Sequence, residues 1–186
     1  MLKLHVIIAS TRPGRIGLPV GSWFGERAKA HGKFEVQIVD LKEVDLPLHD
    51  EPKHPRLQQY EHEHTKRWSA IVSAADAFVF VTPEYNYSPA PSLLNAFDYL
   101  FKEWNYKPAS FVSYGGLSGG LRAVQTAKLA VTALDMMPIT DAVALPFAAK
   151  QIADGIFQAS EANEKAANAA LDGLHRWAQA LKAMRS

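Results

Sequence analysis

Short apolar runs alternate along this chain with longer stretches in which apolar residues recur every three or four positions. The runs have the length and branching of buried strands, and they predict strands over residues 4–9, 34–39, 77–82, 109–114 and 139–145. The longer stretches predict helices over about 17–31, 58–74, 92–101, 121–134 and 171–181. This alternation is typical of an α/β protein whose parallel sheet is covered by helices on both faces.

The alternation allows few topologies. Crossovers between parallel strands are right-handed, so two strand orders remain, the dinucleotide-binding order and the flavodoxin-like order. With 186 residues, of which 48% are hydrophobic, the chain is long enough for a single domain over 1–186 with a sizeable core.

Composition removes several classes of function. A net charge of +1 gives no broad basic surface, so we expect no nucleic-acid partner. The absence of cysteine excludes disulfides, thiol catalysis and cysteine-held clusters. No apolar segment is long enough for a signal peptide or a membrane span, so we expect a cytoplasmic protein with no membrane partner.

Four histidines lie close together between residues 49 and 64, but we expect no metal site there. They have no cysteine partner and no i,i+4 pairing. His62 and His64 are two positions apart, and we expect them to point to different faces of a helix.

The loop after the first predicted strand has the features of a phosphate site. It precedes a helix, whose N-terminus offers free N–H groups and a partial positive charge. Ser10 and Thr11 add hydroxyl donors, and Arg12 and Arg15 add guanidinium groups. Neither G-x-G-x-x-G nor G-x-x-x-x-G-K-[ST] is present, which favours a terminal monophosphate. The alternative is a solvated turn whose arginines face water.

Two further loops follow predicted strands at the same edge of the sheet, where open α/β sheets bind ligands. Tyr85 can stack on a planar ring, and Asn86 can hold a tight turn or bond a ring edge. Glu84 has no histidine or second acid nearby in sequence, so we expect it to be tied to backbone N–H groups. The segment 113–120 contains four glycines whose N–H groups can cradle an anion or a carbonyl oxygen. Tyr85 and Tyr87 can instead be core or interface aromatics.

Together these loops resemble those of the NAD(P)H-dependent FMN reductase family of flavodoxin-like flavoproteins. The resemblance runs from residue 4 to about 145, and the Pro-Glu-Tyr-Asn tetrapeptide at 83–86 is its most specific part. It implies a flavodoxin-like five-stranded parallel sheet of order 2-1-3-4-5. Many members have Ser where this chain has Gly17, so the backbone N–H is expected to serve the phosphate there.

The resemblance implies FMN as cofactor and NADPH or NADH as co-substrate. The residues it assigns to the FMN phosphate are Ser10, Thr11, Arg12, Arg15, Ile16 and Gly17. The residues it assigns to the flavin ring are Pro83, Glu84, Tyr85 and Asn86, with Ser113, Gly115 and Gly116 at its far edge. No catalytic side chain is expected, because flavin N5 accepts the hydride from the nicotinamide. Electrons then pass to a small-molecule acceptor: FMN, a quinone, an azo or nitro compound, or an oxidised metal species.

The predicted helix over 92–101 is apolar on most sides, which favours a subunit interface beside the flavin loop. The family resemblance agrees, since it implies a homodimer or homotetramer. Burial within one chain is the alternative.

Two other functions stay open. One is a flavodoxin-like electron carrier, or a flavin-binding protein without NAD(P)H turnover, although this chain lacks the acidic surface usual in carriers. The other is a domain that binds a sugar phosphate or nucleotide without flavin. Asp40, at the end of the second predicted strand, is interpreted as a structural cap.

Overall fold

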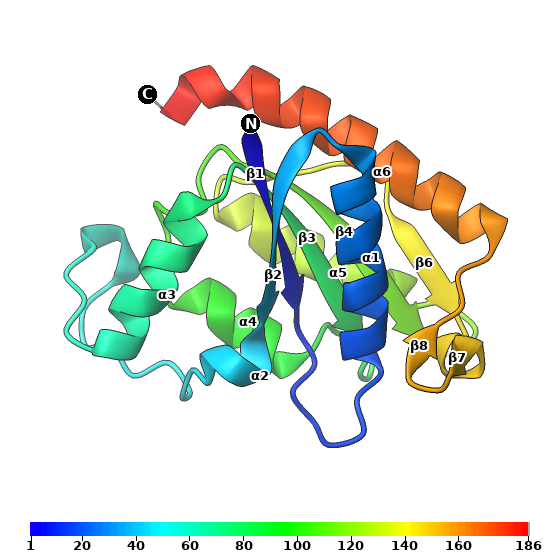
Figure 1. The fold of residues 1–186 in the computed structure, drawn as a ribbon. Helices are drawn as coiled ribbons and strands as arrows, with labels where there is room; N and C mark the ends of the chain where they lie inside the picture. Colours follow the sequence, from blue (N-terminus) through cyan, green and yellow to red (C-terminus); the bar gives the residue numbers. More distant parts are fainter. Residues whose placement is uncertain (186) are drawn as a thin grey trace.

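The computed structural model describes residues 1–185 and has a parallel sheet at its centre (Figure 1). Its strands run in the order β2-β1-β3-β4-β5, and β6 also pairs with β4. The central strands are β1 (Leu2–Ile8), β2 (Phe34–Asp40), β3 (Ala77–Pro83) and β4 (Pro108–Gly115). All of their pairings are parallel, which confirms the predicted flavodoxin-like order.

The single strand predicted over 139–145 is wrong. Two short strands replace it, β5 (Met137–Pro138) and β6 (Val143–Pro146), and each pairs with a different part of β4. Met137 and Ile139 donate their N–H groups to the Lys107 and Ala109 carbonyls at 3.1 and 2.9 Å, so Pro138, which has no N–H, removes no bond from the ladder. Beyond Ile139 the Asp141 carbonyl accepts a bond from Ser110 Oγ at 2.7 Å, and strand pairing resumes only at Val143.

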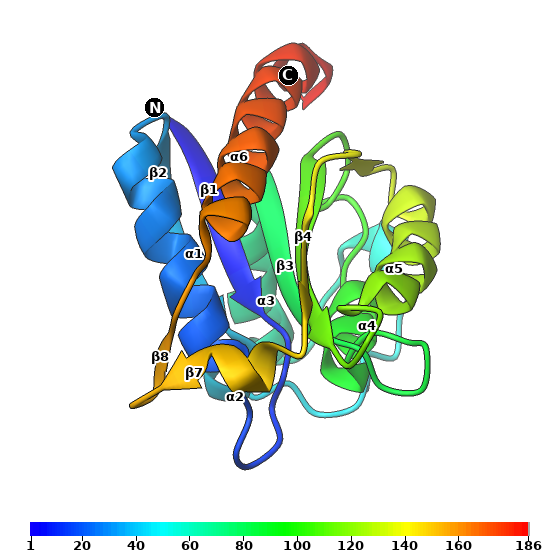
Figure 2. The same cartoon turned by 90° about the vertical axis from the view of Figure 1, so that its right-hand side faces the viewer.

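Helices cover both faces of the sheet (Figures 1 and 2). On one face α1 (Gly17–His31) and α6 (Glu161–Leu181) bury residues such as Phe24 and Leu174. On the other face α3 (Glu63–Ala74), α4 (Pro91–Asp98) and α5 (Leu121–Ala133) pack around an aromatic core that includes Trp68 and Trp104. The two cores hold the strands in place, so the loops at one end of the sheet are carried on a rigid frame.

The boundaries of several helices differ from the prediction. The predicted helix over 58–74 begins only at Glu63, because Gln58 has a left-handed backbone, with φ 52°, and ends a short 3₁₀ turn, η1 (Pro55–Leu57). The short α2 (Leu41–Val44) was not predicted. The Asp40 carboxylate accepts the Lys42 N–H at 3.0 Å at its N-terminus, so the expected cap is present.

Four short elements complete the chain around α6, and none of them was predicted. They are η2 (Ala148–Gln151), the hairpin β7 (Ile152–Ala153) with β8 (Ile156–Phe157), and η3 (Lys182–Arg185). The helix α6 begins ten residues before the first residue of its predicted span, after a capping box between Ser160 and Asn163.

The apolar character of α4 is explained largely within one chain. Leu93, Ala96 and Phe97 are buried in the aromatic core. The subunit interface predicted from this helix therefore needs other support.

The histidine segment is arranged differently from the expectation. The His62 and His64 rings stack with centroids 5.1 Å apart, because His62 lies just before α3 and not within it. His64 Nε2 and the Tyr99 hydroxyl both lie 2.9 Å from an Asp50 carboxylate oxygen, so the cluster ties this long loop to α3. Within residues 1–185 there is no group of three or more metal-ligating side chains, and no helix long and apolar enough to cross a membrane.

Candidate functional site

The loop after β3 is a tight turn that points Tyr85 at the sheet edge. Tyr85 and Ser88 exchange two backbone hydrogen bonds of 2.9 Å. Asn86 and Tyr87, between them, have φ angles of 49° and 69°, the geometry of a type I′ turn. Asn86 therefore holds the turn, as one of the two sequence interpretations expected. Its side chain is exposed, and Tyr87 is 62% exposed, so neither belongs to the core.

Glu84 is held by the N-terminus of α5. Its carboxylate accepts the Arg122 N–H at 3.1 Å, the Ser118 hydroxyl at 3.0 Å and Arg122 Nε at 2.7 Å. Burial opposes ionisation, but the hydrogen bonds from Arg122 and Ser118 prevail and lower the pKa of Glu84. The expectation that backbone N–H groups tie this residue is confirmed, and it follows that the α5 N-terminus is already occupied by a protein carboxylate.

Arg15 is paired with Asp40. Its guanidinium donates to Asp40 Oδ1 at 2.5 Å and to the Ser10 carbonyl at 2.6 Å, and a second nitrogen meets Asp40 Oδ2. This bidentate pair fixes the loop after β1 against the end of β2. The charge of Arg15 is thus balanced within the protein, whereas Arg12 is exposed and has no ion-pair partner within residues 1–185.

Two buried hydroxyls lie under the start of α1. Ser10 Oγ and Tyr114 Oη lie close enough to interact, but neither makes a well-formed hydrogen bond within the described chain. Burial raises the pKa of Tyr114, so its phenol stays a donor. A Cβ at Gly17 would lie 2.2 Å from Ser10 Oγ and 2.6 Å from Tyr114 Oη, so a side chain does not fit here without a shift of these hydroxyls.

The N-terminus of α1 is itself open. Ile16 precedes the helix and supplies no side-chain cap. The N–H groups of Gly17 and Leu18 have no intrahelical acceptor, and Pro19 has no N–H. Free N–H groups, two unsatisfied hydroxyls and an unpaired arginine together suit a phosphate monoester.

A cavity of about 320 Å³ connects this anion site with the ring loops, a size typical of small-ligand sites. It brings together seven of the predicted residues: Arg12, Arg15, Ile16, Pro83, Glu84, Tyr85 and Gly115. Ser10 and Gly17 lie beneath it, beside Tyr114. Both the phosphate loop and the aromatic loop thus reach one hollow at the carboxyl ends of the strands.

Four predicted residues are placed elsewhere. Thr11 lines a neighbouring hollow with Lys42 and Ser92. The buried Ser113 hydroxyl donates to the Gly119 carbonyl at 2.8 Å, so it braces the glycine loop. Asn86 and Gly116 are exposed and do not line the cavity.

Four lining residues were missed from the sequence: Tyr114, Phe147, Ala149 and Lys150. Tyr114 is the last residue but one of β4, and the other three follow β6. The available signal was topological, because the segment after the last parallel strand must reach the same edge as the other ligand loops.

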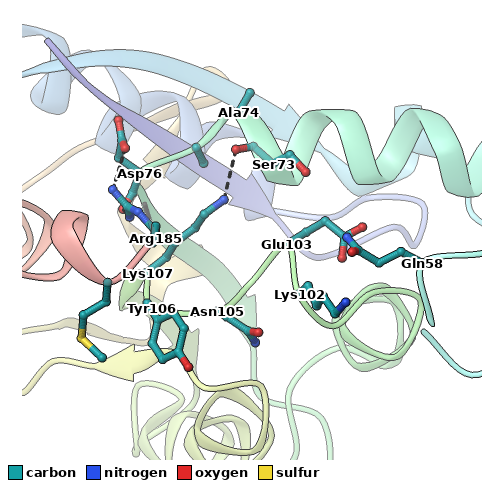
Figure 3. A pocket seen from close by; sticks show the side chains of 12 residues that line it. Gln58, Ser73, Ala74, Asp76, Lys102, Glu103, Asn105, Tyr106, Lys107 and Arg185 are labelled. Atoms are coloured by element: carbon teal, nitrogen blue, oxygen red, sulfur yellow. Dashed lines mark hydrogen bonds and ion pairs between the residues drawn. The ribbon is translucent and has the colours of Figure 1, made fainter. Parts of the chain in front are cut away.

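A larger cavity, of about 470 Å³, lies at the opposite edge of the sheet (Figure 3). Lys107 lies there with its amine 2.8 Å from the Val72 carbonyl and 3.2 Å from that of Ser73, at the C-terminal end of α3. Burial lowers the pKa of Lys107 to about 8. Beside it Arg185 pairs with Asp76. These contacts cap a helix and join chain segments, and none of the ligand loops reaches them.

The fold is flavodoxin-like, and the cavity at its strand ends has charged and aromatic side chains of the kinds that suit a phosphate and a flat ring. The family model of NADPH-dependent FMN reductases matches residues 2–150. An NAD(P)H-dependent FMN reductase of Schizosaccharomyces pombe is 40% identical over 147 residues, covering 77% of this chain and 74% of the relative. The NAD(P)H-dependent FMN reductase ntnL of Nectria sp is 34% identical over 155 residues, covering 80% and 77%.

A solved structure shares the fold across the whole length of the chain. The flavoenzyme NAD(P)H:(acceptor) oxidoreductase FerB of Paracoccus denitrificans superposes with a TM-score of 0.77 at 21% identity, covering 97% of this chain and 98% of that one. The chain belongs to the NADPH-dependent FMN reductase family, a family of oxidoreductases, as the resemblance predicted.

Proposed function

We propose that this protein is an NAD(P)H-dependent FMN reductase that binds FMN in the cavity at the carboxyl ends of the strands. The observation that carries the proposal is the meeting of Arg12 and Ile16 with Pro83 and Tyr85 around one hollow. Family membership supports it, because the matching relatives are named for this activity. The anion site at the start of α1 fits a phosphate, and the aromatic loop fits a flat ring.

The chain's own residues bind and orient the reactants. The N–H groups of α1 and the Arg12 guanidinium bind the phosphate, and the Tyr114 phenol donates to it from below. Tyr85 and Pro83 face the ring, and Gly115 flanks its far edge. When bound, FMN supplies the hydride-accepting and electron-donating chemistry.

No side chain is proposed as an acid or base. Glu84 is held ionised by Arg122 and Ser118, so it fixes the ring loop to α5 and moves no proton. The remaining contribution of the protein is to position the two rings and to place backbone dipoles where the reduced ring carries negative charge.

We also propose the class of electron acceptor. The apolar and aromatic lining of the cavity, with Tyr85 and Phe147, suits flat compounds such as quinones, azo or nitro aromatics, or a second FMN. Oxidised metal species are also proposed as electron acceptors, and they need no separate binding pocket.

A single domain over 1–186, a cytoplasmic location and a homodimer or homotetramer stay predictions. For the oligomer, the support is the family resemblance, because the apolar residues of α4 are largely buried within one chain. Sedimentation equilibrium with and without FMN would test the oligomer, and a monomer in both conditions would contradict it.

The experiment that tests the function is a steady-state assay of NADPH and NADH oxidation with FMN and a quinone. Turnover that depends on both FMN and the acceptor is the expected result. FMN binding without turnover would favour the electron-carrier alternative. A protein that binds no FMN would favour the flavin-free phosphate-binding domain.

A further inference from the structure

One wall of the cavity comes from a segment that holds none of the predicted ligands. Phe147, Ala149 and Lys150 line the cavity together with Arg12 and Ile16. Figures 1 and 2 show β7 and β8, which follow η2 in the chain, near the start of α1 at the end of the sheet where the ligand loops gather. The segment therefore lines the same cavity as Arg12 and Ile16, which are proposed to hold the phosphate.

The backbone of this segment is fixed by the glycine loop. Phe147 has a left-handed conformation, with φ 50° and ψ 37°, which is unfavourable for a bulky side chain. Its N–H donates to the Gly115 carbonyl at 2.9 Å and to the Gly116 carbonyl at 3.2 Å. The next residue, Ala148, is fully buried. These contacts hold the Phe147 ring at the cavity, where it is 48% exposed.

The charges around the cavity leave two cations without a counter-charge. Glu84 is matched by Arg122, and Arg15 is matched by Asp40. Among residues 1–185, neither Arg12 nor Lys150 has an ion-pair partner. The lining contains no carboxylate other than Glu84. This imbalance suits a phosphate monoester, which carries about −1.5 to −2 charges at neutral pH.

Lys150 is one of the two cations unpaired within residues 1–185, and its amine lies beside the Phe147 ring. Its amine lies 5.4 Å from the centroid of the Phe147 ring, within the range of a cation–π contact. The ring holds the amine at the cavity, and the flexible lysine stem lets a compact ammonium reach a phosphate oxygen.

We propose that Lys150, positioned by Phe147, contacts the phosphate of the bound flavin and makes the site select FMN over riboflavin. The inference rests on the proposed function and deepens it, because it names a specificity determinant outside the three predicted loops.

The test is to measure the dissociation constants of FMN and riboflavin by quenching of flavin fluorescence. The proteins are the wild type, Lys150→Ala, Lys150→Arg and a control, Lys165→Ala, which removes an exposed α6 lysine that does not line the cavity. Lys150→Ala should weaken FMN binding roughly tenfold or more while leaving riboflavin binding within about twofold. Lys150→Arg and Lys165→Ala should bind both ligands like the wild type. Circular dichroism checks that each variant is folded.

The outcomes separate this inference from the proposed function. A wild type that binds FMN, with Lys150→Ala binding it equally well, would overturn the role of Lys150 and leave the function intact. Unchanged FMN binding with a raised KM for NADPH but not for NADH would place the lysine on the coenzyme's 2′-phosphate, and would also overturn it. A wild type that binds no FMN would overturn both.

Phe147→Leu tests the positioning role. It should weaken FMN binding less than Lys150→Ala does, and it should add little when combined with it, because it acts through the lysine. Equal losses for FMN and riboflavin would instead mean that Phe147 contacts the ring, which would contradict the positioning role.

Discussion

At the scale of single residues, Arg12 and Arg15 lie in one loop but have different electrostatic partners. Arg15 is bound to Asp40, and Arg12 is free to meet a ligand. Arg12→Ala should therefore weaken FMN binding roughly tenfold or more, with riboflavin binding unchanged, because only FMN carries the phosphate. Titration of the two flavins with the variant measures both affinities.

The matched control for Arg12→Ala is a substitution of Arg15, which is paired with Asp40. Arg15→Ala leaves the Asp40 carboxylate unbalanced near the phosphate, so it should weaken FMN binding, and adding Asp40→Asn should recover part of the loss. Equal losses for FMN and riboflavin in Arg12→Ala would remove Arg12 from the phosphate site. No recovery in the double variant would make Arg15 a direct ligand.

At this scale, the sequence could predict the hydrogen-bond or ion-pair partner of a residue only where that partner lies nearby in the chain. That Glu84 is tied to N–H groups followed from the lack of other acids nearby, but the donor, the start of α5, lies almost forty residues away. The Arg15–Asp40 pair joins loops that only the fold brings together. Phe147 and Lys150 were missed because the predicted fifth strand ended before them, and no motif marked what followed.

At the scale of elements, the proposed phosphate site at the start of α1 can be tested by a single substitution. Gly17→Ala adds a Cβ where Ser10 Oγ and Tyr114 Oη leave no room. The variant should shift the first turn of α1 and weaken FMN binding, while riboflavin binding changes less. The control is Gly14→Ala in the same loop, where a Cβ meets no atom within 4 Å, although its φ of 69° adds some strain. Equal FMN affinity in both variants would contradict a phosphate site at Gly17.

The C-terminal end of α3 gives a pH-dependent prediction. Burial lowers the pKa of Lys107 to about 8, so between about pH 8 and its ordinary value of 10.5 the unfolded chain binds more protons than the folded one. The free energy of unfolding of the wild type, relative to Lys107→Met, should therefore rise with pH across this window. Urea unfolding of both proteins at several pH values measures the difference. A difference that stays flat or falls with pH would contradict the lowered pKa.

The existence of the first four strands and of the long helices was predictable from periodicity. The strand order was predicted only by the family resemblance, and the ends of the elements were not predictable. The strands β1 to β4 were found because each is a continuous apolar run between turns. The error at 139–145 arose because an apolar run does not reveal that the Asp141 carbonyl bonds the Ser110 side chain and that strand pairing stops until Val143. The start of α3 was placed too early because nothing in the pattern shows the left-handed backbone of Gln58.

At the scale of the whole molecule, the proposed ligand site and the structural contacts around Lys107 lie at opposite ends of the strands. The ligand loops gather at the carboxyl ends of the strands, and the two termini lie at the other edge (Figure 1). The cavity of about 470 Å³ at that other end is larger than the one at the ligand loops but is lined by structural contacts, so cavity size alone does not select the proposed site. The rule that open α/β sheets bind ligands at the carboxyl ends of their strands predicted from sequence the end of the sheet where the ligand loops gather.

The central claim is that this chain holds FMN where NADPH or NADH can reduce it. The most direct measurement is an anaerobic visible spectrum of the protein with FMN, taken before and after NADPH and NADH are added, and again after a quinone. The account predicts a bound-flavin spectrum that bleaches with at least one coenzyme and returns with the quinone. A bound flavin that neither coenzyme bleaches, or a protein that leaves FMN free in solution, would contradict it.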